Sequence, residues 1–179
     1  SALEGADLGN FAALWGLQAE WVEEPNQRRG GWSGVSRIVL EFADGPRTAY
    51  LKRQSNHLTR TLRHPISCEP TLSWELKQLL GFARLGLSAP TPLHYAEARV
   101  DGERRALLLV EEVPGQPLDT WVARYPETSR DERDLIIGAV SGFCRRFWGL
   151  GYEYRSLYPK HLFLDHRSIP PAVAAIDLE

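Results

Sequence analysis

Apolar residues recur at helical spacing in several stretches of the chain, as they do along the buried face of an amphipathic α-helix. The spacing predicts helices at residues 7–21, 69–85, 118–125 and 129–150. In the second of these, the expected buried stripe is Leu72, Leu76, Leu79, Leu80 and Phe82. In the last, the expected apolar side is Leu135, Ile136, Ala139, Val140, Phe143, Phe147 and Trp148. Glu75 falls in the second turn of its helix, beside the apolar stripe, and Gly86 is placed to end that helix.

Shorter apolar runs bounded by turn residues predict β-strands. Two hairpins with Asp-Gly turns are expected, with their strands at residues 35–42, 47–52, 93–100 and 104–110. A final pair of strands is expected at residues 161–164 and 172–176. Residues 111–115 contain Pro and Gly and break the strand pattern, which predicts a short hinge between the early sheet and the later helices.

A glycine-rich stretch, RRGGWSGVS at residues 28–36, precedes the first of these strands. Glycine tolerates positive φ and leaves backbone amides uncovered, so Gly30, Gly31 and Gly34 would let the backbone approach phosphate groups closely. The spacing is not GxGxxG, and a plain flexible loop is the alternative. Lys52 ends the second strand, where its ammonium can reach beneath such a loop. A solvated lysine at a strand end is the alternative interpretation of Lys52.

Residues 54–65, QSNHLTRTLRHP, carry basic side chains among few apolar ones, which predicts a loop or short helix with a positive face. Four positive charges fall between Lys52 and Arg63, and they predict an anion-binding face near a cleft, with Arg60 and Arg63 contacting an acceptor. A solvated surface is the alternative. His57 and His64 have no third ligand beside them, so a metal site is not expected there.

Composition limits the classes of function. The 179 residues are 43% hydrophobic and include six Trp, enough for a substantial core in one domain or two small lobes. A net charge of -2 and a pI near 6.2 argue against general recruitment of nucleic acid or an anionic membrane. The two cysteines, Cys68 and Cys144, have neither disulfide-framework nor zinc-ligand spacing, which favours a reducing compartment such as the cytosol.

No apolar run approaches the roughly 18 residues that a membrane span needs, and the N-terminus lacks a signal-peptide pattern. We therefore expect a protein that is neither exported nor membrane-spanning. The sequence contains no Met, which suggests a processed, engineered or incomplete chain.

The segment with the most chemistry is the polar loop YRSLYPKHLFLD at residues 154–165, which is followed by Asp177 at the end of the last predicted strand. Loops held between regular elements commonly carry binding and catalytic residues. The order of Arg155, His161 and Asp177 matches the order of the protein-kinase catalytic loop and its metal-binding aspartate.

Three segments, LKRQSNHLTRTLRHP, GLGYEYRSLYPKHLFL and the closing IDLE, resemble the lipopolysaccharide core kinase family of Gram-negative bacteria, in particular its InaA-type branch. The resemblance extends from Trp21 to Glu179. It implies an α+β, two-lobed protein-kinase-like fold with an antiparallel N-lobe sheet at residues 1–111 and a helical, incomplete C-lobe at residues 112–179.

The resemblance also assigns roles to individual residues. It makes Lys52 the lysine that contacts the nucleotide phosphates, and Glu75 the partner that forms an ion pair with it. It makes Asp177 the metal-holding carboxylate and places His161 where kinases have the asparagine that assists with magnesium. Further residues implied to bind the cofactor are Gly31, Gly34 and Glu111.

Two positions depart from the kinase pattern. Ser156 occupies the place of the catalytic aspartate, and Tyr154 that of the histidine that opens the motif. A hydroxyl does not accept a substrate proton as a carboxylate does, and a missing base costs about 10²- to 10⁴-fold in rate. Phosphoryl transfer depends mainly on positioning and charge stabilisation, so activity can survive that loss. Asp165 is the nearest other carboxylate, but it follows a predicted strand and is expected to point away.

The resemblance therefore implies an ATP- and Mg²⁺-dependent phosphotransferase that acts on a sugar hydroxyl of the lipopolysaccharide core. The expected location is the cytoplasm, with peripheral contact at the inner membrane, and no nucleic-acid partner is expected. The alternative is a pseudokinase, a nucleotide-binding or regulatory module that lacks the catalytic aspartate. A small-molecule kinase of the aminoglycoside type is a third hypothesis, although such an enzyme is expected to keep that aspartate.

Overall fold

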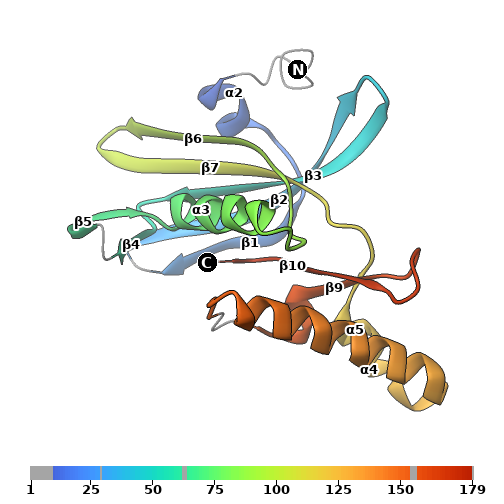
Figure 1. Cartoon of the computed structure of the whole chain (residues 1–179). Helices are drawn as coiled ribbons and strands as arrows, with labels where there is room; N and C mark the ends of the chain where they lie inside the picture. The colour runs from blue at the N-terminus through green and yellow to red at the C-terminus, as the bar shows by residue number, and fades with distance from the viewer. Residues whose placement is uncertain (1–9, 29, 62–63, 154–156, 179) are drawn as a thin grey trace. The chain divides into compact units, whose positions relative to one another are not determined.

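The computed structural model describes residues 10–28, 30–61, 64–153 and 157–178. The chain divides into two compact units. The first comprises residues 1–80 and 91–112 together with residue 179, and the second comprises residues 81–90 and 113–178. Figure 1 shows the elements of each unit along the chain.

The first unit is built on a five-stranded antiparallel sheet with strand order β1-β2-β3-β7-β6. Its strands are β1 (Trp21–Arg28), β2 (Gly31–Phe42), β3 (Gly45–Ser55), β6 (Pro92–Val100) and β7 (Glu103–Glu111). Asp101 and Gly102 both have positive φ, the geometry of a tight two-residue hairpin turn, so the Asp-Gly signal between β6 and β7 forms the expected turn.

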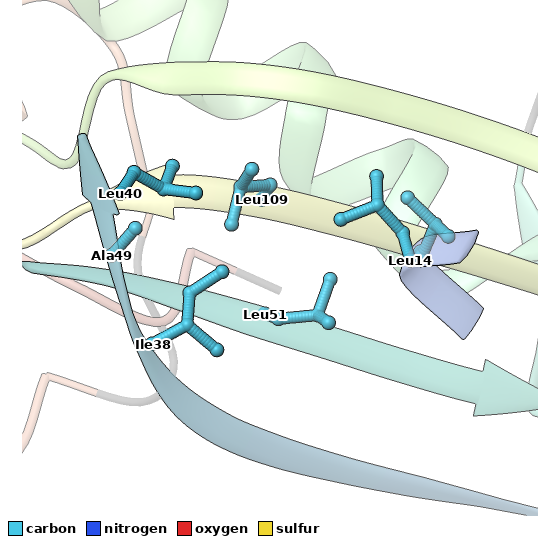
Figure 2. Packing of buried hydrophobic residues seen from close by; sticks show 7 residues of the cluster. Leu14, Ile38, Leu40, Ala49, Leu51 and Leu109 are labelled. Carbon is cyan, nitrogen blue, oxygen red and sulfur yellow. The ribbon is translucent and has the colours of Figure 1, made fainter. Parts of the chain in front are cut away.

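Side chains alternate across this sheet, and the helix α2 (Phe11–Gly16) covers one face of it. Asn10 caps α2 because its side chain accepts a hydrogen bond from the amide of Ala13 at 2.8 Å. Figure 2 shows the apolar cluster beneath this helix, which consists of Leu14, Ile38, Leu40, Ala49, Leu51, Leu107 and Leu109.

The opposite face of β3 contacts the helix α3 (Thr71–Arg84), since Lys52 donates a hydrogen bond to Glu75 and Gln54 accepts one from the Leu72 amide. The fully buried positions of α3 are Leu72, Glu75, Leu79 and Phe82. Glu75 is therefore part of the buried stripe, not beside it as predicted, and Leu80, predicted to be buried, is 42% exposed. A hairpin of β4 (Leu58–Thr61) and β5 (His64–Pro70) leads into α3.

The second unit contains a three-stranded antiparallel sheet with the order β10-β9-β8. Its strands are β8 (Gln116–Pro117), β9 (Leu162–Asp165) and β10 (Ala172–Ala175). Its helices are α4 (Leu118–Ala123) and α5 (Arg130–Gly149), with short 3₁₀ turns at Tyr125–Glu127 and Pro159–His161.

Local sequence explains the start and the buried side of α5. Ser129 caps it by accepting a hydrogen bond from the amide of Glu132 at 3.2 Å. Phe147 packs with Phe82 and Tyr152, at ring centroid distances of 5.7 Å in both cases. The buried stripe is narrower than predicted and includes Ile136, Cys144 and Phe147, whereas Leu135 and Trp148 are 43% and 57% exposed.

Three further predictions about elements are wrong. The predicted helix at residues 7–21 ends at Gly16, and Trp21 begins β1. The predicted glycine-rich loop is largely strand, since β1 ends at Arg28 and β2 begins at Gly31. Ser55 ends β3, and Leu58–Thr61 and the residues from His64 onward form strands β4 and β5, where a loop or short helix was predicted. Within the described part of the chain, no helix combines the length and apolar character required to cross a membrane.

Candidate functional site

Lys52 and Glu75 form an ion pair inside the first unit. Lys52 lies in β3 between its cross-strand neighbours Val35 and Leu108, on the face that contacts α3. Its Nζ lies 2.6 Å from Oε1 of Glu75, and the two side chains are 13% and 1% exposed. The predicted pairing of these two residues is confirmed.

The chemistry of this pair follows from its burial. A carboxylate as deeply buried as that of Glu75 is stabilised by an adjacent positive charge, and removing one partner of a buried pair typically costs about 3–5 kcal/mol. Lys52 is held at a defined place on the sheet with part of its side chain accessible. Such an ammonium is suited to contact an anionic oxygen of a ligand.

The glycines of the predicted phosphate loop have a packing role. A Cβ on Gly31 would lie 2.0 Å from the carbonyl oxygen of Ser55, and one on Gly34 would lie 2.9 Å from the ring of Trp21. Both glycines allow neighbouring strands to approach closely, which explains them without a ligand. Their assignment to cofactor binding stays a prediction.

Glu111 ends β7 and its side chain is engaged within the first unit. Its Oε1 accepts a hydrogen bond from Arg47 at 2.9 Å, and its amide donates to the carbonyl of Thr91. The next residue, Glu112, accepts a hydrogen bond from the hydroxyl of Tyr50 at 2.9 Å. Burial and this hydrogen bond raise the pKa of Tyr50. Glu111 at the end of β7 and Glu112 just after it are thus hydrogen-bonded to residues of β3.

His161 and Asp177 come together in the second unit. The Nε2 atom of His161 lies 3.6 Å from Oδ2 of Asp177, within ion-pair range but longer than a normal hydrogen bond. The side chain of His161 is 11% exposed, whereas that of Asp177 is 42% exposed. A buried imidazole therefore lies next to a carboxylate that solvent and ligands can reach.

Backbone contacts position this pair. The amide of Ile176 donates to the carbonyl of His161 at 2.9 Å, which joins the segment after β10 to the 3₁₀ turn before β9. Asp177 itself has φ of 60°, a left-handed conformation that is uncommon for a residue other than glycine. The ring of Tyr158 contacts His161 edge-on, with centroids 5.6 Å apart.

Asp165 pairs with a residue close to it in sequence, and its expected orientation away from the catalytic loop stays a prediction. Its carboxylate accepts hydrogen bonds from the guanidinium and the amide of Arg167. These contacts lower the pKa of Asp165, so it stays ionised and is a weak base. Ser156 and Tyr154 lie outside the described residues.

The four charges between Lys52 and Arg63 do not share one face, because Arg53 is buried on the side opposite Lys52, whereas the predicted contact of Arg60 and Arg63 with an acceptor stays a prediction. Lys52 and its neighbour Arg53 lie on opposite faces of β3 because successive side chains alternate. Arg53 is buried and donates to the carbonyls of Trp15 and Leu17. Arg60 is exposed, and Arg63 lies outside the described residues.

The sequence interpretation missed a buried polar cluster beside the ion pair. Gln54, His57 and Thr71 are 0%, 6% and 2% exposed and are joined by hydrogen bonds. Their polar side chains suggested a solvated segment. The position of Gln54 in the strand could have indicated this cluster. Gln54 follows Lys52 by two residues, so the two side chains lie on the same face of the strand.

The chain matches the family model described as the lipopolysaccharide kinase (Kdo/WaaP) family over residues 12–179. It belongs to this family. Protein InaA of Escherichia coli (strain K12) is 27% identical to it over 162 residues, which cover 89% of this chain and 73% of InaA. The predicted family is confirmed.

A solved structure described as WaaP in complex with acyl carrier protein shares the fold of this lipopolysaccharide kinase family member. The TM-score is 0.63 with 17% identity, over 93% of this chain and 63% of that one. The α+β, protein-kinase-like fold class is thereby confirmed. The chain spans less than two thirds of the length of that WaaP chain.

Proposed function

We propose that this lipopolysaccharide kinase family member transfers the γ-phosphoryl group of ATP, with Mg²⁺, to a sugar hydroxyl of the lipopolysaccharide core. The observation that carries the proposal is the buried pair of Lys52 and Glu75, at 2.6 Å, in a chain of this family. In kinases a strand lysine held by a helix glutamate contacts the nucleotide phosphates, and both must be in place.

Lys52 contacts the α- and β-phosphates in this proposal, and Glu75 holds its ammonium in position. Glu111, at the end of β7, is assigned to nucleotide binding in the same proposal. Gly31 and Gly34 contribute only by allowing β2 to pack closely against its neighbours, which sets the shape of the sheet above Lys52.

The residues of the second unit fit a magnesium ion that is held largely through nucleotide phosphates. Mg²⁺ in such sites uses one or two carboxylates and keeps several water ligands. Asp177 supplies a reachable carboxylate. Within the described part of the chain, no group of three or more His, Cys, Asp or Glu side chains is arranged to hold a metal alone. When bound, the ion would neutralise charge on the phosphates.

His161 acts on Asp177 in this proposal, not as a metal ligand. Mg²⁺ prefers oxygen to imidazole nitrogen, and Nε2 of His161 faces the Asp177 carboxylate. His161 therefore orients Asp177 and keeps it in place. This role differs from the one that the resemblance to kinases implies for the corresponding asparagine.

A pseudokinase is the second candidate function, and the state of Asp165 favours it. Ser156 stands where kinases have the catalytic aspartate, and Asp165 is the only carboxylate between residues 157 and 165. Because Asp165 is paired with Arg167 and its pKa is lowered, it does not replace the missing base. Positioning and charge stabilisation would then have to supply the catalysis.

ATP turnover by the full-length protein, with and without purified lipopolysaccharide core, separates the two candidates. The phosphotransferase predicts ATP consumption that rises when the core is added, together with phosphate on the sugar. The pseudokinase predicts Mg-ATP binding without turnover in either condition. If the acceptor is the lipopolysaccharide core, the protein should act at the cytoplasmic face of the inner membrane. Fractionation of cells tests this location directly.

A further inference from the structure

A buried polar network ties β3 to the start of α3 next to the ion pair. Gln54 in β3 is fully buried, and its side chain lies on the same face as that of Lys52. Thr71, the first residue of α3, is 2% exposed, and His57 is 6% exposed. Buried polar groups are costly unless they are paired, so these contacts constrain the structure.

Two backbone partners fix the direction of every hydrogen bond in this network. The Leu72 amide donates to Oε1 of Gln54 at 3.2 Å, and Nε2 of Gln54 donates to the His57 carbonyl at 2.8 Å. These contacts set the orientation of the Gln54 amide, since an N–H only donates and a carbonyl only accepts.

The orientation of Gln54 determines the remaining protons. The Thr71 hydroxyl donates to Oε1 of Gln54 at 2.8 Å. Because that proton is used, the contact of 3.0 Å between Thr71 Oγ1 and His57 Nδ1 requires a proton on Nδ1. The Thr71 amide also donates to the His57 carbonyl. The donor and the acceptor of each of these hydrogen bonds are therefore assigned.

This network caps α3 from outside the helix. The first amides of a helix have no partner within it, and a side-chain oxygen usually accepts from one of them. The residue before α3 is Pro70, which has no such oxygen. Oε1 of Gln54 accepts from Leu72 instead. Leu72 lies about one turn before Glu75, so the cap and the ion pair join the same helix face to the same strand.

We propose that Gln54, Thr71 and His57 are positioning residues that hold the first turn of α3 on β3 and so keep Glu75 facing Lys52. A swing of α3 away from β3 would break the ion pair and the hydrogen bonds that Gln54 and His57 make with the first turn of α3. The proposal rests on the proposed function for its role in catalysis, but the mechanical part concerns the ion pair alone.

A double-mutant cycle tests the mechanical part without nucleotide. The coupling between Lys52→Met and Glu75→Gln is measured by urea unfolding of the whole chain, in the parent and in Thr71→Val. We expect a coupling of about tenfold or more in the unfolding equilibrium constant of the parent, and less than about twofold in Thr71→Val. Thr71→Ser, which keeps the hydroxyl, should restore it. Gln54→Leu replaces Thr71→Val if that variant does not fold.

Ser36→Ala is the matched control. It removes a fully buried hydroxyl that accepts from Arg53 at 2.9 Å on the other face of the same sheet. It should lower stability while leaving the coupling between Lys52 and Glu75 intact. Equal coupling in the parent, Thr71→Val and Gln54→Leu would overturn the proposal, as would equal loss in Ser36→Ala.

The role of the network in function is tested by measuring the affinity for Mg-ATP by calorimetry. Thr71→Val and Gln54→Leu should bind about tenfold more weakly, whereas Thr71→Ser and Ser36→Ala should stay within about threefold of the parent. If the parent binds no Mg-ATP, the proposed function fails, and the cycle still decides the positioning role. If Mg-ATP binds equally to all variants, the positioning role is contradicted even though the proposed function stands.

Discussion

The carboxylate of Glu75 lies almost fully buried against the ammonium of Lys52, and this contact joins a helix to a strand 23 residues earlier. Removing the ammonium leaves a buried charge that has lost its neutralising neighbour. Losing one partner of such a buried pair lowers the free energy of unfolding by more than losing a surface ion pair does.

Lys52→Met should therefore lower the free energy of unfolding by about 3–5 kcal/mol. Arg167→Met is the control, because Arg167 is 77% exposed in its pair with Asp165 and its loss should leave stability almost unchanged. Urea denaturation at neutral pH measures both. Equal effects would show that the Lys52 pair behaves as a surface pair.

The phenol of Tyr95 predicts how the stability of the protein depends on pH. Burial, and next the hydrogen bond to Glu97, raise its pKa above the ordinary value of about 10. The folded state then holds the phenol proton where the unfolded state releases it, so stability present below about pH 10 is lost as pH rises further. Stability should fall more steeply in the parent than in Tyr95→Phe between about pH 9 and pH 11. Parallel declines in the two urea titrations would contradict the assignment.

At the residue scale, the resemblance to the kinase family was enough to predict the pairing of Lys52 with Glu75, but not the burial of Glu75. An acid beside an apolar stripe suggests a solvated side chain, because local spacing contains no information about a partner on another strand. The same reason hid the buried state of Arg53 and Gln54, whose partners are the carbonyls of Trp15 and His57.

At the scale of elements, the glycines of β2 set how closely its neighbours pack. The Cβ position on Gly31 overlaps the backbone of residues 55–57. Gly138 in α5 differs, because a Cβ there would have no neighbour within 4 Å. The two positions form a matched pair for the same substitution.

Gly31→Ala should destabilise the protein by at least about 2 kcal/mol through overlap with Ser55, because backbone cannot move aside as a flexible side chain does. Gly138→Ala should stabilise it by about 0.5–1 kcal/mol through helix propensity. Chemical denaturation of both variants checks the contrast. A neutral Gly31→Ala would mean that close packing does not explain this glycine.

Elements with strong periodicity and clear turn signals were predictable. The α3 and α5 helices and the β6–β7 hairpin lie within a few residues of the expected ranges. β1 was missed because its sequence, WVEEPNQR, is polar and contains Pro, and most of its residues are exposed. β4 and β5 were missed because their polar sequence has no alternation, and their pairing with each other defines them.

At the scale of the whole molecule, the family match over residues 12–179 includes residues of both units. The first unit contains the predicted ion pair of Lys52 with Glu75, and the second contains His161 next to Asp177. The proposed function makes nucleotide affinity depend on both Lys52 and Asp177, which lie far apart in sequence.

Calorimetric titration of Mg-ATP into the parent, Lys52→Met, Asp177→Asn and Ser156→Ala tests whether these residues bind the nucleotide and its metal. Mg²⁺ needs anionic oxygen ligands, and Ser156 brings only a neutral hydroxyl. We expect metal-dependent binding to the parent, at least about tenfold weaker binding to Lys52→Met and Asp177→Asn, and a change within about threefold for Ser156→Ala. Unchanged affinity in Asp177→Asn, or binding that does not respond to removal of Mg²⁺ by a chelator, would contradict this expectation.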